Sequence, residues 1–284
     1  MNELEPTIDL TPEQIGFYHR EGYLALDAVT TQEEVAWLRE IYDRLFAIRA
    51  GRAEGNQFDL AGIDEEGTEA TLPQILSPSK YAPELKEGLF RVNALHIARQ
   101  LLGPEAAAHG EHAIFKPAHF GAATPWHQDE AYWNPAMDYH SFSLWIPLQE
   151  ATLENGCLHF VPHSHRWEVL PHHTIGNDPR VHGLEVDKAD TSGAAACPLP
   201  AGGATIHHNR TLHYAGPNRS NTPRRALILG FGLPARPRTE PRVFSWNDQK
   251  RTPREQRARN AAGQTTSTAS ANTPRVNAEG NEIE

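Results

Sequence analysis

The stretch from about residue 105 to 234 consists of short apolar runs separated by Gly, Pro and Asn. The runs at residues 113–115, 142–146 and 226–229 are examples. Apolar runs of this length, bounded by turn-forming residues, are typical of β-strands, and several in succession favour a β-sandwich or a barrel. The central part of the chain is therefore predicted to be mainly β.

Helical signals dominate the part of the chain that precedes this core. Thr11 can cap a helix whose first position is Pro12, and a short strand is expected over residues 23–26. Thr31 and Glu34 have the spacing of a capping box, in which each side chain satisfies a backbone N–H of the other residue. Two helices are therefore expected before residue 50.

A third helix is predicted between residues 89 and 102, where leucine and valine recur at helical spacing. Residues 52–80 have little periodicity and many Gly, Glu and Pro, so we expect a long connection there, with part of a lid as one interpretation. The helical N-terminal part, about residues 1–103, is expected to cover one side of the sheets formed by residues 104–234.

The composition limits the classes of partner. The formal net charge of the 284-residue chain is −10, which argues against nucleic acid and anionic membranes as general partners. The chain contains neither the apolar run of a transmembrane helix nor the start of a signal peptide. Cys157 and Cys197 are its only cysteines, so we expect buried thiols and a cytoplasmic location. The composition indicates no oligomeric state.

The C-terminal part differs in composition from the core. Arg and Lys are frequent between residues 236 and 259, and the sequence after 259 has almost no large apolar residue. We expect one domain over residues 1–249 and a basic, then low-complexity, disordered tail over residues 250–284. A solvated edge is the expected role of the basic stretch, and a site for an anionic partner is the alternative.

The most informative motif is the pair His127 and Asp129, because residues i and i+2 of a strand share one face. Two histidines and one carboxylate on one side of a metal leave open positions, as a non-haem Fe(II) that binds O2 requires. The pattern alone is weak, since composition gives about two such matches by chance, and His19 and His109 begin two others. A hydrogen-bonded core histidine is the alternative for His127.

Candidates for the second metal-binding histidine follow a glycine turn at residues 202–203. His207, His208 and His213 follow it, and a basic pair at residues 224–225 enters the next predicted strand. Strand alternation lets only one of His207 and His208 face inward, and likewise only one residue of the basic pair.

Together these segments resemble the phytanoyl-CoA dioxygenase family of Fe(II)/2-oxoglutarate oxygenases, over roughly residues 8–234. The resemblance rests on Trp126-His127-Gln128-Asp129, on the segment from Asn155-Gly156-Cys157-Leu158 to Pro162-His163-Ser164-His165, on His213 with Asn218 and Ser220, and on Arg224. The ordered set is much more specific than the first motif alone.

The resemblance implies a double-stranded β-helix, a jelly-roll or cupin-like core, with flanking helices. It implies that His127, Asp129 and His213 ligate Fe(II), that Arg224 anchors the distal carboxylate of 2-oxoglutarate, and that Lys116 lies near this co-substrate. A guanidinium suits the anchor role because its parallel N–H donors match a carboxylate. Fe(II), 2-oxoglutarate and O2 are thus the expected cofactor and co-substrates.

The implied activity is a dioxygenase that hydroxylates a small organic molecule and releases succinate and CO2. A catalytically silent metal-binding sensor on the same barrel is one alternative, and a cupin-like metalloprotein that does not use 2-oxoglutarate is another. Asp129 favours an oxygenase outcome over halogenation, because chloride would need its coordination position. Acyl-CoA, amino-acid-like and secondary-metabolite substrates all remain open.

Two departures from the family pattern bear on the site. Tyr214-Ala215 follows the distal histidine where the family commonly has Gly-Ser, so a hydroxyl contact to the co-substrate is missing or replaced. The family's Pro-Gly-Ser-His turn has His163 in place of glycine, which histidine tolerates better than most residues in a left-handed turn.

Aromatic residues are frequent around the first motif. Tyr132 and Trp133 are expected to contact substrate at the barrel mouth, with core packing as the alternative. For Phe142 and Trp145 we expect core packing.

Overall fold

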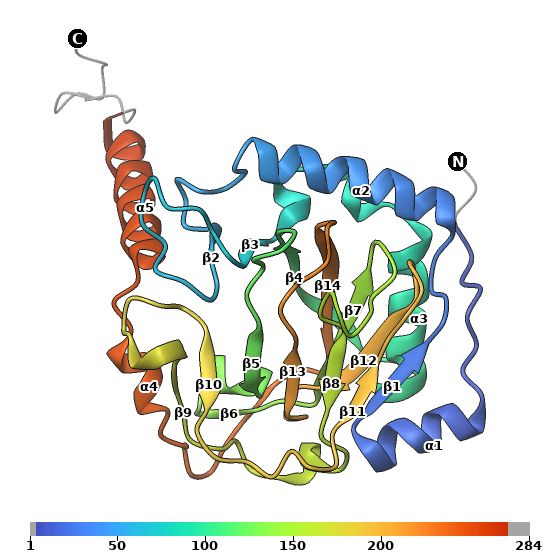
Figure 1. Cartoon of the computed structure of the whole chain (residues 1–284). Helices are drawn as coiled ribbons and strands as arrows, with labels where there is room; N and C mark the ends of the chain where they lie inside the picture. The colour runs from blue at the N-terminus through green and yellow to red at the C-terminus, as the bar shows by residue number, and fades with distance from the viewer. Residues whose placement is uncertain (1–3, 272–284) are drawn as a thin grey trace, which may run out of the picture.

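Two antiparallel sheets face each other in the computed structural model, which describes residues 4–271 and, of these, the side chains up to residue 263 (Figure 1). The large sheet has the order β1-β12-β7-β14-β4-β3-β2, and its strands are β1 (Tyr23–Leu26), β2 (Gln57–Asp59), β3 (Pro73–Leu76), β4 (Ala107–Lys116), β7 (Ser141–Pro147), β12 (Ala204–His208) and β14 (Arg224–Gly232). The small sheet has the order β11-β8-β13-β5, with β5 (Thr124–His127), β8 (Leu158–Phe160), β11 (Ala195–Cys197) and β13 (His213–Ala215).

Two short strand pairs extend this core. They are β6 (Met137–Asp138) with β15 (Arg236–Pro237), and β9 (His172–Thr174) with β10 (Leu184–Val186). Structures similar to this one belong to double-stranded β-helix oxygenases, so the predicted mainly β class is confirmed. The two sheets form no closed barrel.

Helices α1 (Pro12–Glu21), α2 (Gln32–Ala47) and α3 (Leu89–Leu102) cover the outer face of the large sheet. Because side chains alternate along a strand, the large sheet packs on both of its faces. Leu144 and Ile146 of β7 contact the helices, whereas Trp145 between them faces the small sheet. Phe142 lies fully buried on the helical side, so core packing is confirmed for it.

The predicted helix caps are present, with one change. The Thr11 side chain accepts a hydrogen bond from the backbone of Gln14, and Pro12 is the first residue of α1. Thr31 caps α2, but the carboxylate of Glu34 does not complete a capping box. The Glu34 carboxylate instead accepts hydrogen bonds from the backbone N–H groups of Leu89 and Phe90 at 2.7 and 2.8 Å, and so caps α3.

The expectation of a long connection over residues 52–80 is wrong, because β2 and β3 lie within it and form the edge of the large sheet. Their sequence gives little strand signal, since Gln57 and Asp59 are polar although both are buried. The carboxylate of Asp59 accepts from the backbone N–H groups of Thr71 and Leu72 at 2.8 and 3.0 Å, which fixes the intervening loop. Long-range hydrogen bonds, not apolar periodicity, therefore hold this edge.

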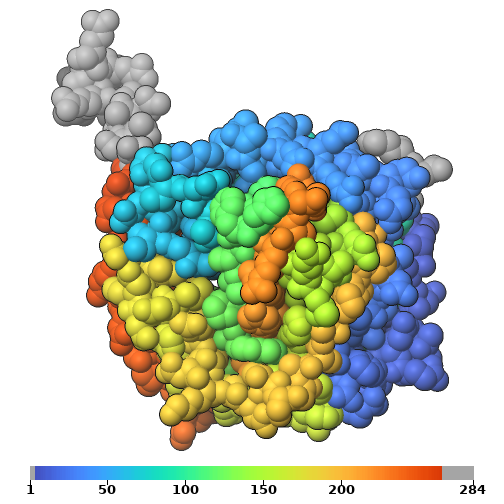
Figure 2. All heavy atoms as spheres, in the orientation of Figure 1, coloured from blue at the N-terminus to red at the C-terminus, as the bar shows by residue number. Residues whose placement is uncertain are grey.

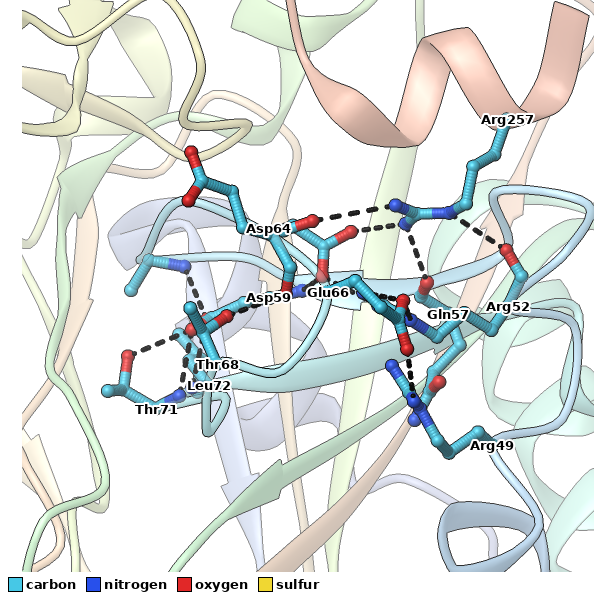
Figure 3. A network of polar contacts seen from close by, with 12 residues as sticks. Arg49, Arg52, Gln57, Asp59, Asp64, Glu66, Thr68, Thr71, Leu72 and Arg257 are labelled. Carbon is cyan, nitrogen blue, oxygen red and sulfur yellow. Dashed lines mark hydrogen bonds and ion pairs between the residues drawn. The ribbon is translucent and has the colours of Figure 1, made fainter.

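The expected disordered tail over residues 250–284 also needs correction where the structure describes it. Lys250 and Thr252 are buried, and helix α5 (Pro253–Ala271) follows them on the side of the molecule opposite α3 (Figure 1). Arg257 reaches from α5 to the carboxylate of Asp64 and the backbone carbonyls of Arg52 and Gln57 (Figure 3). The basic stretch is therefore not a solvated edge over residues 250–257. Residues 272–284 lie outside the described part of the chain.

Among the described residues, no helix has the length and apolar character that a membrane span requires. Cys157 and Cys197 are both free and buried, as expected.

Candidate active site

The two candidate ligand histidines lie side by side on the small sheet. Strand β13 pairs with β5 in a register that sets His213 directly opposite His127. Their ring centroids are 4.1 Å apart, and both side chains are nearly buried in the space between the sheets. Residues 86 positions apart in the sequence are thus brought together by one backbone register (213 − 127).

Asp129 completes this group although it does not lie on the strand. Strand β5 ends at His127, and Asp129 is the first residue of the short helix η3 (Asp129–Tyr132). Gln128 between them is still extended and points the opposite way, where its amide group bonds to the backbone of Leu170 and Arg210. His127 and Asp129 therefore point to the same side, as predicted, because Gln128 between them is extended although the strand has already ended.

The ring orientations of both histidines suit a metal. His127 Nδ1 lies 2.8 Å from the carbonyl of Pro125, and His213 Nδ1 lies 2.9 Å from the carbonyl of Thr211. A carbonyl only accepts, so each Nδ1 carries the proton and each Nε2 presents a lone pair. The two Nε2 atoms lie 3.5 and 3.6 Å from Asp129 Oδ1, and only this group of three residues in the described chain has metal-site geometry.

The charge states also suit a cation. Burial alone would raise the pKa of Asp129, but the neighbouring His213, His127 and His207 hold its pKa well below the usual range. Burial lowers the pKa of His213 well below its usual value, with His127 adding to this effect. An ionised carboxylate beside the neutral His213 imidazole suits the donor set that Fe(II) needs.

The sequence left open which residue of the next histidine pair faces inward. His207 lines the cavity on the inner face of β12, with its ring centroid 4.3 Å from that of His213. His208 lies on the other face, near His165 and His140. Neither residue joins the metal-site group, which contains His213.

Two buried cations lie beside this group. Arg224 of β14 and Lys116 of β4 are direct cross-strand partners, and both are essentially inaccessible to solvent. Burial lowers the pKa of Arg224 to about 9, and burial together with Arg224 lowers that of Lys116 well below its usual value. The Nε and Nη1 atoms of Arg224 have no hydrogen-bond partner, so Arg224 presents free donors to an anion.

Arg225 faces away from this site. Its guanidinium stacks over Phe115 and pairs with Asp43 at 2.7 Å, where Asp43 is exposed. Alternation along β14 thus sends Arg224 inward and Arg225 outward. Trp145, expected only to fill the core, does so but also lines the cavity beneath the Arg224 guanidinium, 5.3 Å from its ring centroid.

A cavity of about 340 Å³ extends from Arg224 past His127, His207 and His213 to the surface. Tyr132 and Trp133 both line it. The sequence missed His109, His112 and His182, which also line it, and the first of these begins a motif that only resembled a metal site. Figure 2 shows the outside of this region, where the cyan segment near residue 60, the green segment near 125 and the yellow segment near 180 meet.

The C-terminal segment supports the cavity wall from behind. Trp246 of α4 (Ser245–Gln249) donates from Nε1 to the carbonyl of Ala131 at 2.9 Å, and Asn247 donates to the same oxygen at 2.8 Å. Lys250 lies over the ring of Tyr132 at 4.6 Å from its centroid. The segment beyond residue 240 therefore fixes the part of η3 that carries Asp129 and Tyr132.

The departures from the family pattern have clear structural outcomes. Ala215 lines the cavity with a methyl group where a hydroxyl is common, and Tyr214 turns away to stack on Trp126. His163 adopts a left-handed conformation with φ of 66°, so the predicted turn forms without glycine.

Comparison with known proteins decides the family. A sequence model of the phytanoyl-CoA dioxygenase family matches residues 18–226. The chain belongs to the phytanoyl-CoA dioxygenase family. Two curated relatives are a probable alpha-ketoglutarate-dependent hypophosphite dioxygenase of Stutzerimonas stutzeri, 29% identical over 77% of each chain, and L-proline trans-4-hydroxylase of Streptomyces griseoviridis, 29% identical over 80% of this chain and 90% of that one.

Solved structures give the same result. EvdO2 from Micromonospora carbonacea var. aurantiaca is 42% identical, with a TM-score of 0.74 over 86% of this chain and 99% of that chain. A second structure of EvdO2, in complex with 2-oxoglutarate, aligns with a TM-score of 0.72. The family member described here is an Fe(II)/2-oxoglutarate-dependent dioxygenase with O2 as its second co-substrate, the first of the three functions considered from the sequence.

Proposed function

We propose that His127, Asp129 and His213 are the iron ligands of this dioxygenase. The observation that carries the proposal is the backbone carbonyl on Nδ1 of each histidine, which directs both Nε2 lone pairs toward Asp129 Oδ1. A carbonyl that accepts from the Nδ1–H of a metal-binding histidine orients the ring and raises the basicity of its Nε2. Three protein ligands on one side of Fe(II) leave positions for 2-oxoglutarate and O2.

We further propose that Arg224 binds the distal carboxylate of 2-oxoglutarate. Its unpartnered Nε and Nη1 lie in a nearly dry site, where a charge-assisted pair with a carboxylate is strong. Lys116 is the supporting cation, since its Nζ already donates to the carbonyls of Ala215 and Gly216 and stands one strand away from Arg224. Without an anion, these two buried positive charges would repel each other.

The proposed reaction inserts one oxygen atom into a C–H bond of the substrate. Substrate, 2-oxoglutarate and O2 give the hydroxylated product, succinate and CO2, and the iron supplies the oxidative decarboxylation that drives this exchange. The task of the chain is to hold 2-oxoglutarate through Arg224, to keep bulk water out and to orient the substrate C–H bond. Because Asp129 is present, we propose hydroxylation or a related oxygenase outcome and no halogenation.

For the substrate we propose a small, uncharged molecule that carries hydrogen-bonding groups. Arg224 is the only Lys or Arg among the cavity-lining residues, all within the described chain, and it is assigned to the co-substrate. The phosphates of an acyl-CoA would therefore find no cation inside the cavity. Burial lowers the pKa of His109 and of His182, so both imidazoles are neutral and can donate as well as accept.

Tyr132 and Trp133 are the proposed aromatic contacts for this substrate. Trp133 packs edge-on against His109 at 5.7 Å between ring centroids, and Tyr132 stacks on His182 at 5.8 Å. Each aromatic ring is thus held by a histidine in the same wall. A reducing cytoplasm remains our proposal for the compartment, since Cys157 and Cys197 are free and buried.

A screen for substrate-dependent succinate release tests the proposed function. Uncharged polar compounds, amino acids and acyl-CoA thioesters are compared with the slow background consumption of 2-oxoglutarate. We expect stimulation by a member of the first class. His213→Ala should abolish both rates, while the control His208→Ala, on the other face of the adjacent sheet, should keep the background rate. A strong response to an acyl-CoA would contradict the substrate proposal, and unchanged turnover in His213→Ala would contradict the ligand assignment.

A further inference from the structure

His207 is a buried polar side chain that lies beside the three proposed iron ligands without belonging to their group. It lies on β12 between β1 and β7, is 3% exposed, and lines the cavity. Neither of its ring nitrogens has a hydrogen-bond partner. A buried polar group without a partner destabilises the fold, so a histidine at this position is expected to serve a purpose that an apolar side chain would not.

The neighbouring histidines differ from His207 in this respect. His127 and His213 each use Nδ1 on a backbone carbonyl, whereas Nδ1 of His207 has no such partner. The polar atom that faces His207 Nε2 is Asp129 Oδ2, at 3.4 Å. Only a small tightening is needed to bring this contact within hydrogen-bond range.

Asp129 Oδ2 already has one donor. Ser143 Oγ lies 2.6 Å from it, and Ser143 is the direct cross-strand partner of His207 in the pairing of β7 with β12. The two side chains therefore approach the carboxylate from adjacent strands of the large sheet. The other oxygen, Oδ1, faces the Nε2 atoms of His127 and His213 on the small sheet.

We propose that His207 is a positioning residue that donates from Nε2–H to Asp129 Oδ2 and, with Ser143, holds the carboxylate so that only Oδ1 is offered to the iron. The inference rests on the proposed ligand set. Two donors on Oδ2 disfavour a bidentate carboxylate, which would occupy a position that 2-oxoglutarate or O2 needs. His207 thus acts on the metal through Asp129 and is not itself a ligand, in agreement with its absence from the metal-site group.

The affinity of the full-length protein for Fe(II), titrated anaerobically in competition with a chromophoric chelator, tests this proposal. Loss of a group that hydrogen-bonds to a metal ligand typically weakens metal binding about 10–100-fold. We expect this loss for His207→Phe, which keeps a ring but has no donor. His207→Gln, whose amide N–H can donate, should restore most of the affinity. The matched control His208→Phe changes the adjacent histidine, which faces away from Asp129, and should bind as the wild type does.

Wild-type affinity in His207→Phe would overturn the proposal, and so would a His207→Gln variant as weak as His207→Phe. Circular dichroism checks the fold first. If His207→Phe does not fold, His207→Met takes its place, because methionine fills irregular space without a strong donor.

Spectroscopy separates positioning from ligation. Pulsed electron paramagnetic resonance of the Fe(II)–nitric oxide adduct counts coordinated imidazoles, and we expect two in the wild type and two in His207→Phe. Three in the wild type would make His207 a ligand and refute its positioning role. His213→Ala is the reference: if it still binds Fe(II), the ligand assignment fails, whereas normal binding in His207→Phe alone refutes only the role of His207.

Discussion

Replacement of Arg257 by alanine should destabilise the whole domain, although this residue lies beyond the boundary that composition predicts. The Arg257 guanidinium pairs with the carboxylate of Asp64, whose side chain is only 6% exposed (Figure 3). It also donates to the carbonyls of Arg52 and Gln57 at 2.9 and 3.3 Å. These contacts tie α5 to strand β2 and to the segments on both sides of it.

The size of the loss in unfolding free energy depends on which hydrogen-bond partners Asp64 keeps in Arg257→Ala. An unpaired buried charge costs about 3–5 kcal/mol. Asp64 would still accept from Arg52 at 2.7 Å and from the backbone N–H of Asp59 at 3.1 Å, so the loss is that of one charged hydrogen-bond set. Such bonds contribute roughly 1.5–3 kcal/mol each. We therefore expect Arg257→Ala to lower the free energy of unfolding by about 2 kcal/mol.

Urea unfolding followed by tryptophan fluorescence measures this loss. The matched control is Arg259→Ala on the same helix, because Arg259 is exposed and donates a long hydrogen bond of 3.3 Å to Gln256. Its change should stay within about 0.5 kcal/mol, as for ordinary surface positions. Equal midpoints for the two variants would show that α5 does not dock through Arg257. Such a result would contradict the conclusion that residues 250–257 pack on the domain.

Three further predictions concern the site and the backbone. Arg224→Ala should raise the 2-oxoglutarate concentration needed for half-maximal turnover by roughly tenfold or more, because a charged hydrogen bond is lost. Arg225→Ala should change this concentration little, since the partner of Arg225 is the exposed Asp43. Equal shifts in the two variants would contradict the anchor role of Arg224. Gly156→Ala should lower the thermal midpoint, since φ is +88° and a Cβ would lie 2.2 Å from the carbonyl of Gly216, whereas Gly16→Ala in α1, with nothing within 4 Å, should not. Background 2-oxoglutarate consumption should not depend on chloride, and mass spectrometry of the product of an accepted substrate should find no chlorination; a chlorinated product would refute Asp129 as a ligand.

The sequence predicted the site more fully than the fold around it, because local spacing carries ligand chemistry. His127 and Asp129 form one of three similar pairs in the sequence, and the order of His213 and Arg224 after them, which matched a family pattern, singled this pair out. The inward orientation of His207 could not be predicted, since alternation says that one of two histidines faces inward but not which. The pairing of β12 with β7 decides this, and that register is a long-range property.

Two elements were missed for a related reason. Strands β2 and β3 have buried polar residues such as Gln57 and Asp59, whose burial depends on hydrogen-bond partners far away in the sequence. Residues 250–257 are basic and were expected in solvent, but the carboxylate that holds Arg257 lies 193 positions earlier, at Asp64. Composition describes a segment by itself and therefore cannot predict a buried ion pair between distant segments.

The anaerobic visible spectrum with Fe(II) and 2-oxoglutarate tests the proposed site most directly, because the chelate gives a weak charge-transfer band only when both bind the same metal. The band should form in the wild type and in His208→Ala, should be absent in His213→Ala, and should need a higher 2-oxoglutarate concentration in Arg224→Ala. A band of wild-type intensity in His213→Ala, or its absence from the wild type, would contradict the assignment of iron and 2-oxoglutarate to this site.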